Sequence, residues 1–200
     1  KQGFKEDCPI TGITVKKYYN AEDSRTTGGY QVDKTEMTIR YGEILLNYAE
    51  ALNELTEGQV YHVTNYMGED VTIQRDAGEM RYAIKRIRMR AGVPDYSNET
   101  YNNQSDFRVK LKRERQVELF AENSMRYFDL LRWKDALQEE NQLLQGCDIN
   151  ISDDQTRVAD FYKPTIITTV HKMFEQRMYL WPCPTYELKR NVNMTQNPGW

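Results

Sequence analysis

The sequence lacks any long apolar stretch, since no segment approaches the roughly 20 apolar residues that cross a bilayer as a helix. It also lacks an excess of basic charge, with 27 Lys and Arg residues against 30 Asp and Glu residues and a formal net charge of −3. The first absence leaves no candidate for a membrane span, and the second leaves no overall positive field to recruit nucleic acid. With 39% hydrophobic and 28% charged residues over 200 positions, the composition is that of an ordinary globular protein of one or two domains.

Cysteine is scarce: Cys8, Cys147 and Cys183 are the three present, and none lies in a C-x-x-C motif. Disulfide-stabilised scaffolds are short and dense in cysteine, so we expect no disulfide framework. One disulfide stays open beside the favoured alternative that all three are small buried apolar residues. The chain begins KQGFKED without a methionine, and we expect further residues upstream, with any targeting signal among them.

The motifs of metal and nucleotide chemistry are missing as well. His62 and His171 are far apart and have no H-E-x-x-H context, so no zinc site is expected. Asp148 opens a segment like a calcium loop, but Asp153 stands at the glycine position and Ala159 at the final glutamate, which favours a plain polar turn. There is no G-x-S-x-G, P-loop or dinucleotide motif. We therefore expect no metal, no cofactor and no enzymatic activity.

Helical periodicity begins near residue 37. A helix is predicted over 37–57, with Thr35 or Thr38 as its cap, Gly58 at its end, and one apolar stripe formed by Tyr41, Leu45, Tyr48, Leu52 and Leu55. A second helix is predicted over 79–91, ended by Gly92, with one face formed by Met80, Ile84, Ile87 and Ala91. The segments 59–78 and 95–105 are predicted to be loops.

A pair of helices is predicted next, over 107–122 and 125–137. Asp106 is a suitable N-cap for the first helix, Asn123 tolerates the left-handed backbone of a tight turn, and Ser124 is a suitable cap for the second. Further on, we expect an extended piece at 165–170 and a short helix that Pro184 opens and Asn191 ends. Residues 1–35 are predicted to be extended and irregular.

The stretch FRVKLKRERQVELFAENSMRYFDLLRWKD, residues 107–135, mixes basic and aromatic residues. It is either a surface that binds nucleic acid or an internal lattice of ion pairs. Acidic residues lie at helical spacing from the arginines, and apolar residues surround most of both predicted helices, which indicates burial. Because buried arginines must be paired, we favour the lattice and expect no nucleic-acid partner. Its members are Glu114, Arg115, Glu118, Glu122, Arg126, Asp129 and Arg132.

Tyrosine is abundant, with 14 residues, and four of them fall in the predicted polar loops beside asparagines: Tyr61, Tyr66, Tyr96 and Tyr101. Aromatic rings stack on the C–H faces of sugars while amide side chains bind the hydroxyls, so these four are candidates for contact with a glycan. The alternative for each is a ring that packs on the domain with its hydroxyl in water.

Four segments together resemble the C-terminal part of a SusD/RagB-type outer-membrane nutrient-binding lipoprotein. They are IRYGEILLNYAEALNE (39–54), IRMRAGVP (87–94), ERQVELFAENSMRYFDLLRW (114–133) and YLWPCPTYELKRN with the terminal QNPGW (179–200). The resemblance covers residues 36–200, and residues 1–35 match less clearly. Two positions depart from it: Asn123 stands where glycine is usual, and Cys183 where an aliphatic residue is common.

The resemblance implies a mainly α fold of tetratricopeptide-like helix pairs with long irregular loops and few short strands. Residues 36–200 would form a SusD/RagB-like C-terminal helical domain, preceded by the extended segment 1–35. It also implies a lipid anchor upstream of residue 1, the outer face of the outer membrane, and a SusC-like TonB-dependent transporter as partner.

The ligand that the resemblance implies is an oligosaccharide, or in some members a peptide. A helical-repeat scaffold that binds only proteins remains the alternative from a different class. A glycan binder should present an exposed aromatic platform in a concave site, whereas a scaffold should present a large apolar groove without one.

Overall fold

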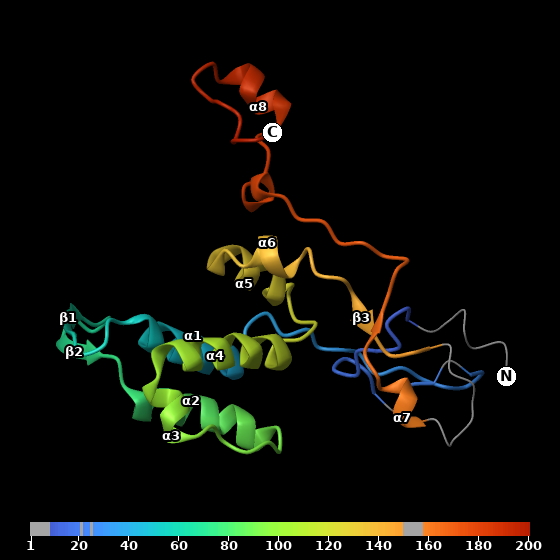
Figure 1. Cartoon of the computed structure of the whole chain (residues 1–200), viewed down its shortest axis with the longest axis horizontal. Coiled ribbons are helices and arrows are strands. Elements are labelled where there is room, and N and C mark those ends of the chain that lie inside the picture. The colour runs from blue at the N-terminus through green and yellow to red at the C-terminus, as the bar shows by residue number, and fades with distance from the viewer. Residues whose placement is uncertain (1–8, 21, 25, 150–157) are drawn as a thin grey trace. The chain divides into compact units, whose positions relative to one another are not determined.

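The computed structural model describes residues 9–20, 22–24, 26–149 and 158–200. Helices predominate among these residues and the strands are few and short, so the mainly α class is confirmed (Figure 1). The chain divides into two compact units. We call Thr35–Arg126 the helical unit, and the residues up to Lys34 together with Tyr127–Trp200 the terminal unit. The predicted division between residues 35 and 36 stays a prediction.

Helix α1 (Tyr41–Glu54) lies within the predicted segment 37–57, but its buried face differs from the predicted stripe. Tyr41 and Tyr48 were expected to be buried, and their side chains are 63% and 43% exposed. The residues that α1 buries are Leu45, Leu46, Ala49, Leu52 and Asn53. The stripe shifts because α1 packs against both α2 and α4, so two partners rather than one define its inner face.

Neither predicted boundary residue of α1 is used. The N-cap is Arg40 in place of Thr35 or Thr38, and it makes no side-chain cap bond because a guanidinium has no acceptor. Its guanidinium donates instead to the carboxylates of Glu118 and Glu122. At the other end the C-cap is Leu55, so Gly58 lies in the turn beyond the helix. In the first turn, a Cβ on Gly42 would lie 2.5 Å from Arg40 Nη1, so glycine leaves room for that guanidinium.

The segment predicted as a loop over 59–78 contains a β-hairpin instead. Strands β1 (Val60–Thr64) and β2 (Asp70–Gln74) pair antiparallel, with Val60 opposite Gln74 and Thr64 opposite Asp70. Both segments are rich in β-branched residues, which favour strands. The side-chain oxygen of Asn65 accepts hydrogen bonds from the backbone of Met67 and Glu69 and so fixes the turn.

Helix α2 (Ala77–Arg90) agrees with the predicted helix 79–91, and Asp76 caps it by accepting from the Glu79 backbone. Its end is the predicted glycine: Gly92 has φ +74° and donates to Met89 O, while Val93 donates to Arg88 O. This bonding pattern is a Schellman motif, which satisfies the last carbonyls of a helix and needs the left-handed residue that glycine supplies.

The predicted loop 95–105 is partly helical. It contains α3 (Asn98–Asn102) and the start of α4 (Gln104–Glu118). The N-cap of α4 is Asn103, whose side chain accepts from the Ser105 and Asp106 backbone, so the predicted cap at Asp106 is wrong. Asp106 lies in the first turn, where its charge still complements the helix dipole.

Helix α4 ends four residues before the predicted boundary at 122, and a tight turn follows it. Ala121, Asn123 and Ser124 have φ angles of 60°, 42° and 55°. Asn123 therefore adopts the predicted left-handed backbone, while Ser124 departs from the extended conformation of an N-cap. The Asn123 side chain adds a role that glycine lacks, since its amide donates to the carbonyls of Met37 and Thr38 at 2.9 Å each.

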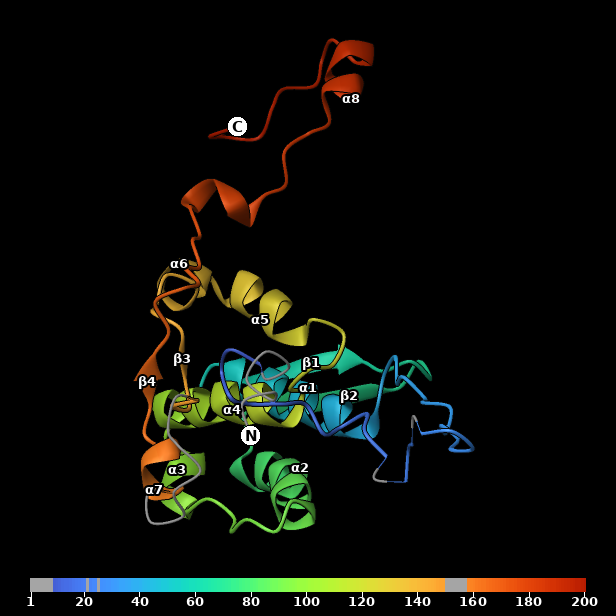
Figure 2. The same cartoon turned by 90° about the vertical axis from the view of Figure 1, so that its right-hand side faces the viewer.

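The core of the helical unit lies where α1 packs on α2 and α4, and α3 closes it against α2 and α4 (Figure 2). Its fully buried members include Leu46, Met80, Ile84, Tyr101, Phe107 and Leu111. The expectation that the predicted helix 107–122 is buried around most of its circumference is wrong, because Val109 and Val117 on α4 and Phe120 just beyond its end are 68%, 60% and 52% exposed. Helix α4 turns only one face to α1.

The terminal unit combines short elements with irregular chain. Helix α5 (Met125–Trp133) leads into it and ends before the predicted boundary at residue 137. The next residue, Lys134, has a left-handed backbone with φ 63°. The other elements are α6 (Ala136–Glu139), β3 (Gln145–Gly146), α7 (Val158–Phe161), β4 (Thr165–Ile166), the 3-10 helix η3 (Gln176–Tyr179) and α8 (Thr185–Arg190). Strand β4 lies in the predicted extended piece, and it pairs with β3.

The small core of the terminal unit consists of Leu130, Ala136 and Phe174, with Met178 and Tyr179 packed against it. Helix α8 begins after Pro184 and ends at Asn191, as predicted. The described residues before Thr35 form turns and irregular chain, and Cys147 donates its backbone N–H to Thr11 O beside β3. Most of the calcium-like segment, and Cys8, lie outside the described residues.

Candidate functional site

Two of the four candidate tyrosines belong to the interior of the helical unit. Tyr101 is 1% exposed, its hydroxyl donates to Asp95 Oδ1 at 2.7 Å, and its ring centroid lies 5.1 Å from that of Phe107. Tyr96 is half-buried and donates to Glu114 Oε2 at 2.7 Å, and the Arg88 guanidinium lies 3.9 Å above its ring. Of the two alternatives for these residues, the ring that packs on the domain agrees with the structure, except that each hydroxyl donates to a carboxylate instead of to water.

Their environment keeps both phenols protonated. Burial raises the pKa of Tyr96 and of Tyr101, and the carboxylates of Glu114 and Asp95 that accept their hydrogen bonds raise it further. Burial also acts to raise the pKa of Asp95, but hydrogen bonds from Tyr101 and Arg81 outweigh it, so the pKa lies below the ordinary value. The two tyrosines thus act as fixed hydrogen-bond donors within the unit.

The other two candidates lie on the β-hairpin. Tyr61 is half-buried on β1, and its hydroxyl accepts a hydrogen bond from the Thr56 backbone at 3.4 Å. Tyr66 lies at the hairpin turn and is 92% exposed. Of the four, only Tyr66 offers a largely free ring, so the structure does not bring the predicted tyrosines together into one platform.

The predicted lattice residues of α4 are paired mainly with other elements. Glu118 Oε1 accepts from Arg40 Nη1 and from Arg90 Nη2, each at 2.6 Å, and Glu122 Oε2 accepts from Arg40 Nε at 2.7 Å. Glu114 Oε2 accepts from Arg88 Nη1 at 2.5 Å. These bonds tie α4 to α2 and to the start of α1, where the sequence pattern had suggested partners along the same helix.

Arg115 is the most deeply buried of the predicted arginines, at 2% exposed. It donates to Asn47 Oδ1 at 2.6 Å, and its Nε lies 3.6 Å from Glu50 Oε2. Both partners are on α1. The charges in the core of the helical unit therefore connect helices, which is a framework role.

The two lattice arginines on α5, Arg126 and Arg132, are less buried than expected. Asp129 is 3% exposed, whereas the Arg132 side chain that donates to it at 2.9 Å is 43% exposed. Arg126 is half-buried. A short helix at the edge of the small core leaves long side chains at the surface, so burial could not be inferred from helical spacing alone.

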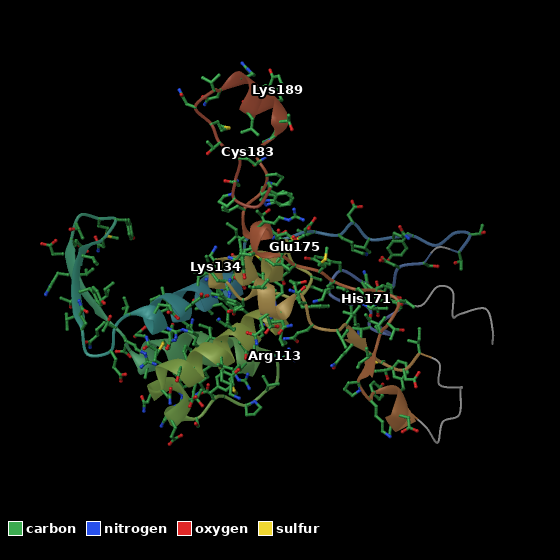
Figure 3. The ribbon with its side chains drawn as sticks, turned by 45° about the horizontal axis from the view of Figure 1, so that its top comes forward. Arg113, Lys134, His171, Glu175, Cys183 and Lys189 are labelled. Atoms are coloured by element: carbon green, nitrogen blue, oxygen red, sulfur yellow. The ribbon has the colours of Figure 1, made fainter. Side chains whose placement is uncertain are left out.

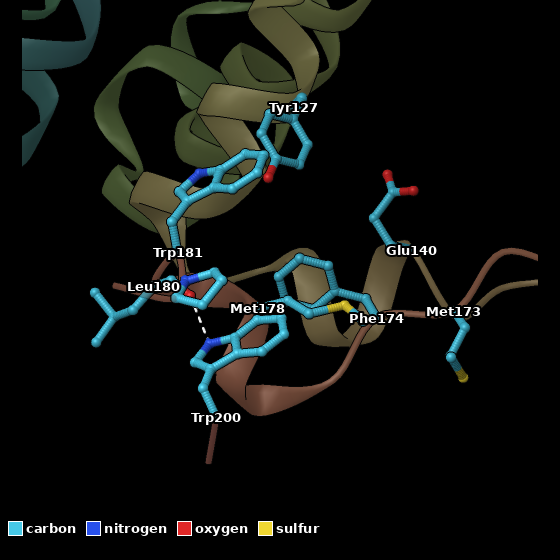
Figure 4. A pocket seen from close by; sticks show the side chains of 9 residues that line it. Tyr127, Glu140, Met173, Phe174, Met178, Leu180, Trp181 and Trp200 are labelled. Carbon is cyan, nitrogen blue, oxygen red and sulfur yellow. Dashed lines mark hydrogen bonds between the residues drawn. The ribbon is translucent and has the colours of Figure 1, made fainter. Parts of the chain in front are cut away.

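A different set of aromatic residues surrounds a hollow of about 430 Å³ in the terminal unit (Figure 4). We call it the aromatic pocket. Helix α5 contributes Tyr127, the end of α6 contributes Glu140, and η3 contributes Met178. The remaining lining residues come from the irregular chain: Met173, Phe174, Leu180, Trp181, Pro182 and Trp200.

Hydrogen bonds of the C-terminal segment fix the backbone beside Trp181 and the ring of Trp200. Asn197 Nδ2 donates to Trp181 O at 2.5 Å, and Gln196 bonds to both the N–H and the carbonyl of Cys183. Trp200 Nε1 donates to Arg177 O and Leu180 O at 3.1 and 3.0 Å, and the second of these bonds is the dashed line in Figure 4. The QNPGW segment thus anchors Trp200 and supports the backbone beside Trp181.

Asn141 holds Phe174, another lining residue of the pocket, in place. Its side chain accepts from Phe174 N and donates to Phe174 O, at 2.9 and 2.8 Å. Phe174 is 6% exposed and so forms a floor, whereas Trp181 and Trp200 are 73% and 44% exposed. The pocket therefore combines open indole rings with a rigid apolar base, and it has the volume of a small-ligand site.

The polar groups of the pocket are few. Glu140 supplies a carboxylate, whose Oε2 lies 3.3 Å from Lys172 Nζ, and Tyr127 supplies a hydroxyl. Such a site can stack flat apolar faces on the rings and bind hydroxyl groups at its edge.

A second hollow, of about 630 Å³, lies in the helical unit and has a polar lining without aromatic residues. It is bordered by Glu57, Glu99, Asn102, Asn103, Gln104 and Ser105. Two of these are already engaged: Asn103 caps α4, and Gln104 donates to Asn53 O and Leu55 O. The aromatic pocket is therefore the stronger candidate for a binding site.

Comparison with known proteins identifies the family. The sequence profile of the SusD family matches residues 1–200. The chain belongs to the SusD family. This SusD-family chain is 26% identical over 200 residues to SusD-like protein P2 of Formosa agariphila, a match that covers 97% of the chain and 32% of that relative.

A solved structure agrees. The crystal structure of a SusD-like protein from Bacteroides fragilis matches with a TM-score of 0.56 and 29% identity, over 81% of this SusD-family chain and 25% of the other. Both the SusD/RagB resemblance and the mainly α fold are thereby confirmed. The chain spans about a third of the length of the curated relative and about a quarter of the solved one.

The described part of this SusD-family chain contains neither a metal-binding cluster nor a membrane-spanning helix. No group of three or more His, Cys, Asp or Glu side chains there could hold a metal ion. His171, Glu175 and Cys183 lie at separate positions in the terminal unit (Figure 3), and Cys147 and Cys183 are free thiols. Across the same residues, no helix has the length and apolar character needed to cross a bilayer.

The pocket residues were missed as site residues, although a signal for them existed. The segments that contain Trp181 and Trp200 were used only to recognise the family. Two tryptophans beside prolines in a chain with three tryptophans in total could have suggested an aromatic site, because tryptophan offers the largest stacking face. The two tryptophans come together because the side-chain amide of Asn197 donates a hydrogen bond to the carbonyl of Trp181, 16 residues earlier in the chain. The spacing of residues in the sequence does not reveal such a bond.

Proposed function

We propose that this protein captures oligosaccharides at the aromatic pocket and releases them unchanged for uptake. The observation that supports it is the pair of open indole rings, Trp181 and Trp200, set in a hollow with the Glu140 carboxylate at its edge. An exposed aromatic platform in a concave site is the feature that separates a glycan binder from a protein scaffold. Membership of the SusD family supports a carbohydrate-binding role in nutrient uptake.

The cellular setting follows from the family rather than from the pocket. We propose the extracellular face of the outer membrane, a lipid anchor upstream of residue 1, and a SusC-like TonB-dependent transporter that receives the ligand. The SusD-family match and the SusD-like relatives support this location, this anchor and this partner. Co-purification of the tagged protein with a TonB-dependent transporter tests the proposed partnership. If the protein is recovered without any such transporter from cells grown on glycan, the result counts against this partnership.

The proposed binding mode uses each wall differently. The open face of Trp181 takes the apolar C–H face of one sugar ring, and Trp200 limits the depth to which the ring enters. The Tyr127 hydroxyl and the Glu140 carboxylate then bind sugar hydroxyls at the rim. Because Phe174 and Trp200 are held by hydrogen bonds before ligand arrives, little ordering of the protein is needed on binding.

The test is calorimetric titration of the purified protein with a panel of oligosaccharides. Trp181→Ala should weaken the best ligand about tenfold or more, since truncation removes a large stacking face, while Trp181→Phe should retain part of the affinity. Tyr66→Ala tests the hairpin in the same way. Tyr186→Ala removes another exposed ring, outside the pocket, and should leave affinity unchanged.

Two results would decide against the pocket. If Trp181→Ala binds as tightly as the wild type while Tyr66→Ala does not, the site is the hairpin. If no oligosaccharide in the panel binds but peptides do, capture of peptide replaces capture of glycan.

One observation favours the alternative of a protein-interaction scaffold. The outer side of α1 and α2 exposes Tyr41, Ile44, Tyr48, Tyr82 and Met89. Tyr48 donates to Glu79, and Tyr41 accepts from Arg86, so these rings form one face across the two helices. Under this alternative, Ile44→Asp abolishes binding of a protein partner and leaves glycan binding untouched, whereas Trp181→Ala does the reverse.

A further inference from the structure

The lining of the aromatic pocket carries a carboxylate and no cation among the described residues. Among the described residues that line it, Glu140 is the charged one, and the others are aromatic, aliphatic, proline or methionine. Two cations beside the lining have partners of their own: Lys172 pairs with Glu140, and Arg177 pairs with Glu175 at 2.8 Å while its guanidinium lies 4.8 Å from the Trp200 ring. In the part of the chain that the structure describes, no arginine or lysine lines the pocket.

We infer that the pocket selects uncharged sugar units and rejects sulfated sugars and uronic acids, with Glu140 as the residue that sets this preference. The inference rests on the proposed function and narrows its substrate class. It concerns the chemical class of the glycan bound, which the fold and the family leave open.

The physical argument starts from the ring faces. Aromatic faces carry negative electrostatic potential, so they attract C–H groups and cations and repel anions. Four aromatic side chains border the pocket: Tyr127, Phe174, Trp181 and Trp200. An anionic substituent placed among them loses hydration, and no guanidinium fork is present in the lining to replace the lost hydrogen bonds.

The Glu140 carboxylate adds to this preference. Opposite charges attract and like charges repel more strongly where apolar walls exclude water, so a sulfate or carboxylate on the sugar is repelled at short range. A hydroxyl, in contrast, donates to Glu140 in a charge-assisted bond. Lys172 reduces the repulsion between Glu140 and an anionic sugar, because its Nζ lies 3.3 Å from Glu140 Oε2. The other carboxylate oxygen, Oε1, is then the one that accepts from a sugar hydroxyl.

The experiment compares matched glycans by calorimetry at low ionic strength. The two pairs are a desulfated carrageenan tetrasaccharide with its sulfated parent, and cellotetraose with its C6-oxidised uronate form. We expect at least one neutral member to bind about tenfold or more tightly than its anionic counterpart, and the ratio to narrow with added salt because exposed charges are screened. Glu140→Gln should reduce the ratio several-fold, and Lys172→Gln should increase it.

Glu187→Gln provides the matched control, because it also removes one carboxylate from the terminal unit but lies on α8, outside the pocket, and is exposed. It should leave the ratio unchanged. Equal affinity for both members of each pair, or tighter binding of the anions, overturns the inference and leaves glycan capture standing. Discrimination that Glu140→Gln does not alter overturns the role of Glu140. Absence of binding to every glycan overturns the proposed function itself.

Discussion

At the scale of single residues, the contribution of a carboxylate to stability depends on how much water reaches the ion pair that it forms. Glu118 and Glu54 are both bound by arginines in the helical unit, at 2.6 Å. Glu118 is 8% exposed beside Arg40 at 17%, whereas Glu54 and Arg108 are 48% and 41% exposed. Water screens the second pair and barely reaches the first.

Replacement of Glu118 by glutamine should therefore lower the free energy of unfolding by about 3–5 kcal/mol, because Arg40 is left buried with an incomplete set of acceptors. Glu54→Gln is the matched control and should cost about 1 kcal/mol or less. Urea denaturation followed by far-ultraviolet circular dichroism measures both. Equal losses for the two variants would show that burial does not decide the strength of these pairs.

The buried phenols predict a loss of stability in alkali. The folded pKa of Tyr101 is raised above its ordinary value near 10, so its contribution to stability is complete below about pH 10 and falls as pH rises towards the folded pKa. In this range the free energy of unfolding should fall by up to about 1.4 kcal/mol per pH unit for Tyr101. Tyr101→Phe should be less stable at pH 8 but show a shallower decline above pH 10. A decline that is unchanged in this variant would assign the effect to other groups.

At the scale of elements, Asn123 stabilises the turn between α4 and α5 in two ways that substitutions can separate. Asn123 supplies a left-handed backbone and two hydrogen bonds to the carbonyls of Met37 and Thr38. Asn123→Gly keeps the backbone and should cost about 1–2 kcal/mol through the lost hydrogen bonds. Asn123→Ala should cost about 1 kcal/mol more, because a Cβ disfavours the left-handed region. Thermal melts rank the three proteins, and an alanine variant as stable as the glycine variant would exclude backbone strain.

The helices that could be predicted are those whose signals are local. Helix α2 has an apolar face at helical spacing and a glycine at its end, and α8 has a proline before it and an asparagine after it. Their boundaries agree with the sequence because neighbouring residues determine them.

Prediction was weaker where partners come from distant segments. The cap of α1 is an arginine because Glu118 and Glu122 hold its side chain, more than 70 residues away in the chain. The hairpin was taken as a loop because its strands bury little and carry polar residues among the β-branched ones. Tyr96 and Tyr101 were treated as open because their neighbours in sequence are polar. In the structure the Tyr96 hydroxyl donates to Glu114 on α4, and the Tyr101 hydroxyl donates to Asp95 of the same predicted loop, which folds back on the core.

At the scale of the whole molecule, the remaining question is which part of the chain a ligand protects. The aromatic pocket draws its lining from residues 127–200, and the exposed Tyr66 lies on the hairpin at 60–74. Amide hydrogen exchange with mass spectrometry reads both regions in one experiment. A ligand at 100 times its Kd stabilises the bound state by about 2.7 kcal/mol, so amides that exchange by opening the pocket should slow by up to about 100-fold.

We expect this protection at hydrogen-bonded amides of the pocket lining and of the chain directly beside it: Phe174 N bonded to Asn141, Leu180 N bonded to Arg177, and Cys183 N bonded to Gln196. Amides of the hairpin turn, such as Met67 N and Glu69 N bonded to Asn65, should exchange at the same rate with and without glycan. Trp181→Ala should remove the protection while leaving the exchange of the free protein unchanged, because 73% of that side chain is exposed and its loss costs little packing. Protection confined to residues 60–74 would instead locate ligand at the hairpin, and the tryptophans would then serve only to hold the C-terminal segment in place.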